Sequence, residues 1–217
     1  MERAGPAIAV AGLRRDYGDR PALEGVGFEL AAGESLVVLG QNGAGKTTLL
    51  RVLATLLRPS GGEVAVLGCS LPDEAWKLRG RIGYLGHEPL LYRDLSGREN
   101  LRFQARLHGM QRAAAEARIE ELLRAVGMER RADERVAELS AGMRQRLSIC
   151  RCVLHGPELL LLDEPDSNLD AEGRELAREL IGPGAATRVV VTHDPERHLP
   201  EADQVLRLGI GEAAVVS

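Results

Sequence analysis

The chain has 217 residues, of which 44% are hydrophobic and 28% charged, so it can bury a sizeable core and is not intrinsically disordered. Its net charge of −4 provides no bulk attraction to nucleic acid, and we expect no nucleic-acid partner. The three cysteines form no CxxC pair, and no stretch approaches the ~18 continuous apolar residues of a membrane span. We therefore expect a reduced, cytoplasmic protein.

The first part of the chain is predicted to form short strands around one helix. Strands are expected at Ala7–Val10 and Gly27–Leu30, on either side of a polar turn that begins at Tyr17. The β-branched run Ser35–Leu39 predicts a third strand. A buried helix is predicted over Thr47–Leu57.

The composition changes in the middle of the sequence. After two short strands at Glu63–Leu67 and Ile82–Leu85, residues 96–155 are rich in Arg, Glu, Ala and Leu, which predicts a helical insertion with stops at Gly109 and Gly127. Continuous apolar runs then follow at Leu159–Leu162 and Arg188–Thr192. Such runs are typical of parallel strands that are covered on both faces of a sheet.

The end of the sequence completes an α/β pattern. A short helix is predicted over Ala171–Leu180, and late strands over Val205–Leu208 and Ala213–Val216. We predict a single domain over the whole chain. Its α/β core comprises residues 1–95 and 156–217, and its helical subdomain comprises residues 96–155.

A glycine-rich loop carries the first chemical motif. Residues 40–47 fit the phosphate-binding pattern GxxxxGK[ST] and lie between a predicted strand and a predicted helix. Backbone N–H groups of such a loop can turn toward phosphate oxygens, and the helix adds its positive N-terminal end. We expect Lys46 to reach the β and γ phosphates of a nucleotide and the Thr47 hydroxyl to bind Mg²⁺. The predicted nucleotide-binding residues of this segment are Gly40, Gln41, Asn42, Gly43, Ala44, Gly45, Lys46, Thr47 and Thr48.

Polar residues at the ends of two apolar strands supply the rest of the predicted site. Asp163 follows Leu159–Leu162, and at the carboxyl edge of a sheet it can hold Mg²⁺ through water. Glu164 can polarise the attacking water as a general base. His193 ends the next apolar strand, where it can hydrogen-bond the γ-phosphate and the water. We predict Glu164 and His193 as catalytic residues, and Thr47 and Asp163 as metal-binding residues.

A second predicted phosphate-binding element is a helix start at Ser140. This residue is a good N-cap, and Gly142 permits close approach of a backbone. The plain alternative is an ordinary capped helix. Because this helix end lies far along the chain from Lys46, it suggests a contact with a nucleotide that is held by a second subunit.

The order of GQNGAGKT, LSAGMRQRL, LLLLDEP, SNLD and VVVTHD resembles that of ABC ATPases, over essentially the whole chain. The resemblance implies a P-loop NTPase of ABC ATPase type, with a mixed-sheet core and an inserted α-helical subdomain. It also implies a head-to-tail homodimer, or a dimer with a second ATPase subunit, that holds two ATP molecules and Mg²⁺. Ser140 and Gly142 would contact the nucleotide of the other subunit, and Tyr17 would stack on adenine. An integral membrane permease subunit would hold the protein at the inner face of the cell membrane.

Three features depart from the pattern of this family. His87 stands where the family has a Gln that contacts Mg²⁺ and the membrane partner. Because Mg²⁺ prefers oxygen, we expect His87 to act on the γ-phosphate or through water. The signature motif of the family, most often LSGGQ, reads LSAGM here, starting at Leu139. The segment from Asp170 to His193 is shorter than is usual in the family. Leu90, Leu91 and Tyr92 are predicted to form an apolar lip for the membrane partner.

Residues 83–89 and the short tail resemble the haem-exporter ATPase of cytochrome c biogenesis. We therefore expect an ATPase that drives export, with haem as one candidate cargo. Drug- or polysaccharide-exporter ATPases are alternatives, as is a soluble ABC ATPase of iron–sulfur assembly. ABC proteins of DNA repair or translation usually carry coiled coils or two fused halves, for which this chain has no room. A P-loop kinase would leave the segment at Ser140 without a purpose.

Overall fold

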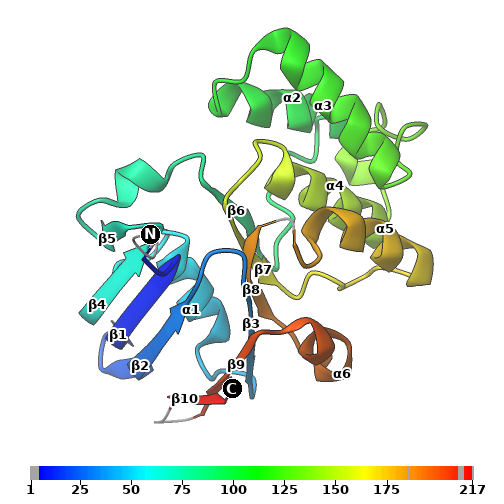
Figure 1. Cartoon of the computed structure of the whole chain (residues 1–217). Helices are drawn as coiled ribbons and strands as arrows, with labels where there is room; N and C mark the ends of the chain where they lie inside the picture. Colours follow the sequence, from blue (N-terminus) through cyan, green and yellow to red (C-terminus); the bar gives the residue numbers. More distant parts are fainter. Residues whose placement is uncertain (1–4, 185, 210–212, 217) are drawn as a thin grey trace.

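Two β-sheets form the core of the structure, a computed structural model that describes residues 5–184, 186–209 and 213–216 (Figure 1). The antiparallel sheet has the strand order β2-β1-β4-β5. Its strands are β1 (Ile8–Tyr17), β2 (Arg20–Leu30), β4 (Gly61–Val66) and β5 (Cys69–Leu71).

The second sheet has six strands in the order β10-β9-β3-β8-β7-β6. All neighbouring strands are parallel except β10, which pairs antiparallel with β9. The strands are β3 (Ser35–Gly40), β6 (Ile82–Leu85), β7 (Leu159–Asp163), β8 (Thr187–Val191), β9 (Gln204–Leu208) and β10 (Ala213–Val216). The predicted mixed-sheet α/β class is thus confirmed.

Alternate residues of the six-stranded sheet feed two separate hydrophobic cores. In β7, Leu160 and Leu162 belong to the core under the helical insertion, whereas Leu159 and Leu161 face the antiparallel sheet. Because successive side chains of a strand point to opposite faces, both faces of this strand must be apolar. That requirement explains the unbroken run of leucines.

The helix α1 (Lys46–Leu53) lies between the two sheets, in contact with β2 on one side and with β3, β7 and β8 on the other. It ends four residues before the predicted end at Leu57. Thr55 has a left-handed φ of 62°, and Leu56 N–H donates to Arg51 O. Thr55 N–H donates to Val52 O in the same turn. This pair of bonds is a Schellman motif, which stops the helix without a glycine.

Most of the helices lie on the other face of the six-stranded sheet (Figure 1). The chain between β6 and β7 contains α2 (Gly97–Leu107), α3 (Arg112–Ala125) and α4 (Ala141–Val153), which confirms the helical character predicted for this segment. The helix α5 (Ala171–Ile181) packs against α4, and α6 (Pro195–His198) follows β8. The described residues also contain the 3-10 turns η1 (Ala75–Leu78), η2 (Val136–Glu138) and η3 (Leu199–Glu201).

The first two strands are longer than predicted. β1 continues to Tyr17, and β2 begins at Arg20, so Tyr17 ends a strand instead of opening the turn. A register shift between Val10 and Leu13, where Gly12 has a φ of 60°, breaks the alternation of apolar and polar residues. Sequence periodicity therefore misses the second half of β1.

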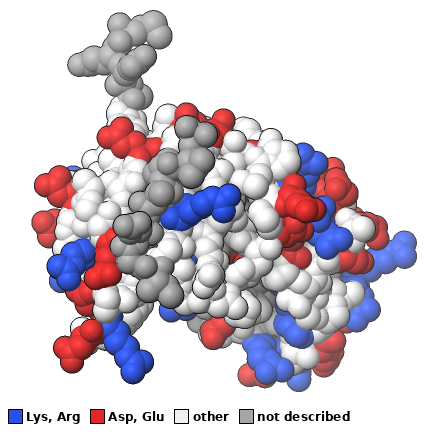
Figure 2. All heavy atoms as spheres, turned by 90° about the horizontal axis from the view of Figure 1, so that it is seen from below, with Lys and Arg blue, Asp and Glu red and all other residues white. Residues whose placement is uncertain are grey.

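The surface carries charges of both signs. On the face shown in Figure 2, acidic and basic side chains are interspersed, and no broad basic field covers it. Within the described residues, no helix is long and apolar enough to cross a membrane.

Candidate functional site

The loop of residues 40–47, here called the phosphate loop, connects β3 to α1 and encloses its lysine. Lys46 is only 7% exposed, and its Nζ donates to Gly40 O at 2.7 Å and to Gln41 O at 3.0 Å. The first intrahelical bond of α1 runs from Leu49 N–H to Gly45 O. The N–H groups before Leu49 at this helix start therefore have no intrahelical acceptor and are available to phosphate oxygens.

Gly45 shows why this loop needs glycine. Its φ is 91°, and a Cβ atom there would lie 2.2 Å from Ala22 O of β2. Gly43 also has a positive φ, 84°, but a Cβ there would meet no atom within 4 Å. Both positions need a left-handed backbone, and Gly45 additionally permits the loop to lie directly on β2.

Two oxygen atoms suited to Mg²⁺ meet at the start of α1. Thr47 Oγ1 donates to Asp163 Oδ2 at 2.9 Å, which joins the phosphate loop to the carboxyl end of β7. Asp163 is 4% exposed. Hydroxyl and carboxylate oxygens are ligands that Mg²⁺ accepts, often together with water, so this pair fits the predicted metal.

Glu164 and His193 face each other at the ends of neighbouring strands. His193 N–H donates to Glu164 Oε2 at 3.3 Å, and His193 Nε2 lies 3.4 Å from Glu164 Oε1, which is buried without a hydrogen-bond partner among the described residues. Glu164 has a left-handed φ of 52°. Burial raises the pKa of its carboxyl, and His193 opposes that effect only in part. An elevated pKa and a strained backbone are common features of functional carboxylates.

A cavity of about 450 Å³, here called the phosphate-loop cavity, collects these groups, and its volume lies in the range of small-molecule sites. Of the residues predicted to bind nucleotide or metal or to act in catalysis, it is lined by Asn42, Gly43, Gly45, Lys46, Thr47, Thr48, His87, Asp163, Glu164 and His193. Gly40 and Gln41 contribute through their carbonyl groups, which hold Lys46. Ala44 is buried behind the loop.

Tyr17 is not among the residues that line this cavity. Tyr17 is 46% exposed, and the Arg15 guanidinium lies 4.9 Å from the ring centre. Adenine stacking on Tyr17 therefore stays a prediction.

Ser140 and Gly142 also lie outside the phosphate-loop cavity. Ser140 is exposed at the start of α4, and its Oγ accepts from Met143 N–H at 3.2 Å, which confirms the predicted N-cap. A Cβ atom at Gly142 would lie 2.8 Å from Asn168 O. Gly142 thus permits close contact with the loop that follows Glu164.

Sequence reasoning missed the residue that couples this helix to the site. Gln145 is 5% exposed in α4, and its Nε2 donates to Pro165 O at 2.9 Å. Pro165 directly follows Glu164, so α4 helps to fix the backbone of the predicted general base. A polar residue on the buried face of a predicted helix was the available signal.

Together, the fold and the loop define the class of protein: an α/β protein that carries a P-loop at the carboxyl edge of a parallel sheet. Residues 23–167, more than half of the chain, match the ABC transporter family. The chain belongs to this family, as an ATPase domain.

Two relatives cover nearly the whole chain. It is 42% identical to the daunorubicin resistance ATP-binding protein DrrA3 of Streptomyces coeruleorubidus, over 98% of this chain and 67% of that protein. It is 38% identical to the Nod factor export ATP-binding protein I of Rhizobium meliloti (strain 1021), over 94% of this chain and 62% of that protein. The chain therefore spans about two thirds of the length of these relatives. A solved structure of the ATP binding subunit of an ABC transporter has a TM-score of 0.89 and 30% identity, and the match covers 97% of this chain and 90% of that one.

Proposed function

We propose that this chain hydrolyses ATP in order to drive export through a separate membrane subunit. The observation that carries the proposal is the convergence of Lys46, the Thr47–Asp163 pair and the Glu164–His193 pair on one cavity. Lys46 and the loop N–H groups would hold the phosphates, and Thr47 and Asp163 would hold Mg²⁺, which supplies charge neutralisation when bound. Glu164 would take the proton of the attacking water, and His193 would orient that water.

We propose further that two ATPase domains act as a head-to-tail dimer, with Ser140 and Gly142 completing the nucleotide site of the partner subunit. Ser140 lies outside its own phosphate-loop cavity but stands at an exposed helix start. The N-terminus of α4 offers free N–H groups to a phosphate. Both copies would contribute the same two surfaces, as a two-fold axis requires.

The direction of transport is proposed from the relatives. One is a daunorubicin resistance protein and the other a Nod factor export protein, and both are longer than this chain. They favour an exporter ATPase of the drug-resistance or Nod-factor-export type. Haem export, which residues 83–89 suggested, gains no support from these relatives.

An exposed apolar surface supports a membrane partner. Leu90, Tyr92 and Phe103 are 54%, 57% and 37% exposed, and the rings of Tyr92 and Phe103 meet edge to face at 5.1 Å. Leu91 is half-buried against the helical core, so Phe103 takes its place in the predicted lip. His87 lies in the same segment and lines the phosphate-loop cavity. The segment can therefore couple a docked membrane helix to the nucleotide.

Affinity purification from detergent extracts of the producing cells tests the membrane partner. An integral membrane protein is expected to co-purify with the wild-type chain. Leu90→Glu places a charge in the apolar contact and should reduce the recovered partner by about tenfold or more, as truncation of a central interface residue does. Leu56→Glu is the matched control, because Leu56 is 59% exposed elsewhere on the surface.

The absence of any integral membrane protein from the wild-type sample would argue for a soluble ABC ATPase instead. Equal recovery of that protein with Leu90→Glu and with wild type would contradict the docking surface at Leu90. ATP binding by the purified Leu90→Glu variant shows that the domain has folded.

A further inference from the structure

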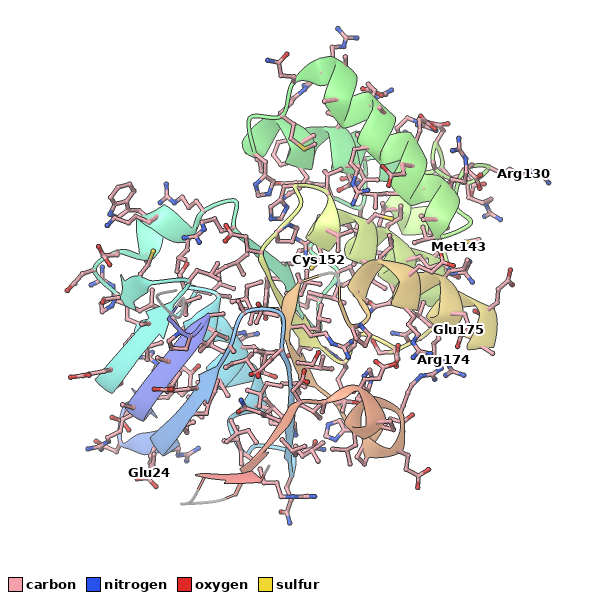
Figure 3. All side chains as sticks on the ribbon, viewed as in Figure 1. Glu24, Arg130, Met143, Cys152, Arg174 and Glu175 are labelled. Atoms are coloured by element: carbon pink, nitrogen blue, oxygen red, sulfur yellow. The ribbon has the colours of Figure 1, made fainter. Side chains whose placement is uncertain are left out.

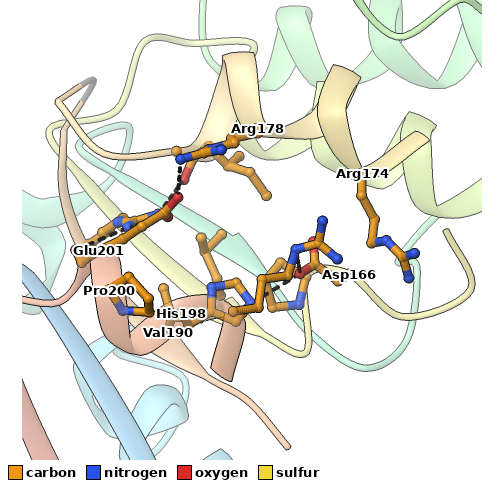
Figure 4. A pocket seen from close by; sticks show the side chains of 13 residues that line it. Asp166, Arg174, Arg178, Val190, His198, Pro200 and Glu201 are labelled. Carbon is orange, nitrogen blue, oxygen red and sulfur yellow. Dashed lines mark hydrogen bonds and ion pairs between the residues drawn. The ribbon is translucent and has the colours of Figure 1, made fainter. Parts of the chain in front are cut away.

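Figure 4 shows a second cavity, which is lined by residues of α5, α6 and the six-stranded sheet. Leu162 and Val190 line it, whereas the next residues, Asp163 and Val191, line the phosphate-loop cavity. Because adjacent residues of a strand face opposite sides, the two cavities lie back to back across β7 and β8. The second cavity has a volume of about 360 Å³, within the range of small-molecule sites. It is called the arginine cavity below.

Positive charge is in excess around the arginine cavity. Its lining contains four arginines but only two carboxylates: Arg174, Arg178, Arg188 and Arg197 against Asp166 and Glu201. Arg178 and Arg188 share Glu201, at 2.5 Å and 3.0 Å. Arg197 Nε lies 3.5 Å from Asp166 Oδ2. Arg174 forms no ion pair with any described residue, and its Nε has no hydrogen-bond partner there.

A buried histidine presents an unused ring nitrogen in the same lining. His198 is 7% exposed, and its Nε2 lies 3.0 Å from Asp166 Oδ2, whereas its Nδ1 has no partner among the described residues. The carboxylate favours a proton on Nε2. Nδ1 can then accept from a ligand O–H group. A buried nitrogen without a partner is costly unless a ligand or water satisfies it.

We propose that the arginine cavity binds a small phosphate monoester with an apolar body. A phosphate monoester offers oxyanions to Arg174 and Arg197 and, in its monoanionic form, an O–H group to His198 Nδ1. Pro200, which is exposed, and the edge of Ile181 supply an apolar surface for the body of the ligand. The site is separate from the nucleotide chemistry, because the two cavities share no lining residue.

Calorimetric titration of the full chain with phenyl phosphate tests this site. Saturating Mg²⁺ and ADP are present throughout, so that the phosphate-loop cavity cannot take up the probe. A dissociation constant on the order of 1 mM or tighter is expected for a ligand of this size. Inorganic phosphate should bind more weakly because it lacks the apolar body, and benzyl alcohol should not bind because it lacks the charge.

Arg174→Gln is expected to weaken phenyl phosphate binding by about tenfold or more, the loss typical of one charge-assisted hydrogen bond. Gln is about as good a helix former as Arg, and Arg174 has no ion pair among the described residues to lose, so the variant should fold. Arg130→Gln is the matched control, because Arg130 is exposed in the turn after α3 and does not line the arginine cavity (Figure 3). Its affinity should equal that of wild type.

Three outcomes would overturn the proposal. Phenyl phosphate could fail to bind the wild-type chain at about 10 mM, well above the expected constant. It could bind Arg174→Gln as tightly as wild type. Benzoate could bind as tightly as phenyl phosphate, which would remove the assignment to phosphate. None of these readouts depends on ATP hydrolysis or on a membrane partner.

Discussion

Replacing Lys46 by alanine is expected to lower ATP hydrolysis by at least about 10²- to 10³-fold, the cost of removing one preorganised charge from a developing anion. Lys46 is the only lysine that lines the phosphate-loop cavity. Its Nζ is held by hydrogen bonds to Gly40 O and Gln41 O of the same loop. ATP affinity should fall as well. Steady-state phosphate release and nucleotide titration measure the two effects.

Lys77→Ala is the matched control for that experiment, since Lys77 is the other lysine of the chain. It lies on η1, where it pairs with Glu74, and it does not line the phosphate-loop cavity. Its hydrolysis rate should equal that of wild type. Undiminished turnover by purified Lys46→Ala would contradict the assigned site.

Glu164→Gln is expected to separate nucleotide binding from chemistry. The amide keeps the shape of the side chain but cannot accept the proton of water, so hydrolysis should fall by about 10²- to 10⁴-fold while ATP still binds. Size-exclusion chromatography with Mg²⁺ and ATP should show more dimer for this variant than for wild type, because the ATP-bound state persists. A variant that hydrolyses ATP normally would remove Glu164 from the role of general base.

The environment of Glu164 also predicts how wild-type activity responds to pH and how this variant responds to heat. Burial raises the pKa of the carboxyl, so wild-type activity should begin to fall, on acidification, at a higher pH than an exposed carboxylate would dictate. A raised pKa in the folded chain means that the ionised form is destabilised by folding at neutral pH. The neutral amide of Glu164→Gln should therefore leave Tm unchanged or raise it.

Much of the site could be predicted because its chemistry fixes both residue types and spacing. The phosphate loop and the strand that ends in Asp163 could be identified from the sequence. In the structure, β8 lies between β3 and β7. That order brings His193 to Glu164, as expected for a neighbouring parallel strand. Each of these parts of the site is a short local motif that follows a predicted strand. A single sequence shows both the motif and the strand before it.

The features that sequence reasoning missed depend on local exceptions or on distant partners. The second half of β1 was hidden by the register shift near Gly12, and the end of α1 by a threonine in a left-handed conformation. The bond from Gln145 to Pro165 joins residues that are 20 positions apart. Arg188 was predicted within a strand, but its buried contacts with Ser35 and Glu201 arise only from packing of the whole domain. No periodicity encodes such contacts.

The head-to-tail dimer is tested most directly by mixing two inactive variants, Lys46→Ala and Ser140→Arg. Ser140→Arg should lose hydrolysis yet bind ATP as a monomer, because Ser140 lies outside its own phosphate-loop cavity. In a mixed dimer, one site would carry both changes and the other would be intact. An equal mixture should therefore regain about a quarter of wild-type activity, since half of the dimers are mixed and each has one good site of two. If the mixture stays as inactive as its components, or if Ser140→Arg alone abolishes ATP binding, the shared-site account is contradicted.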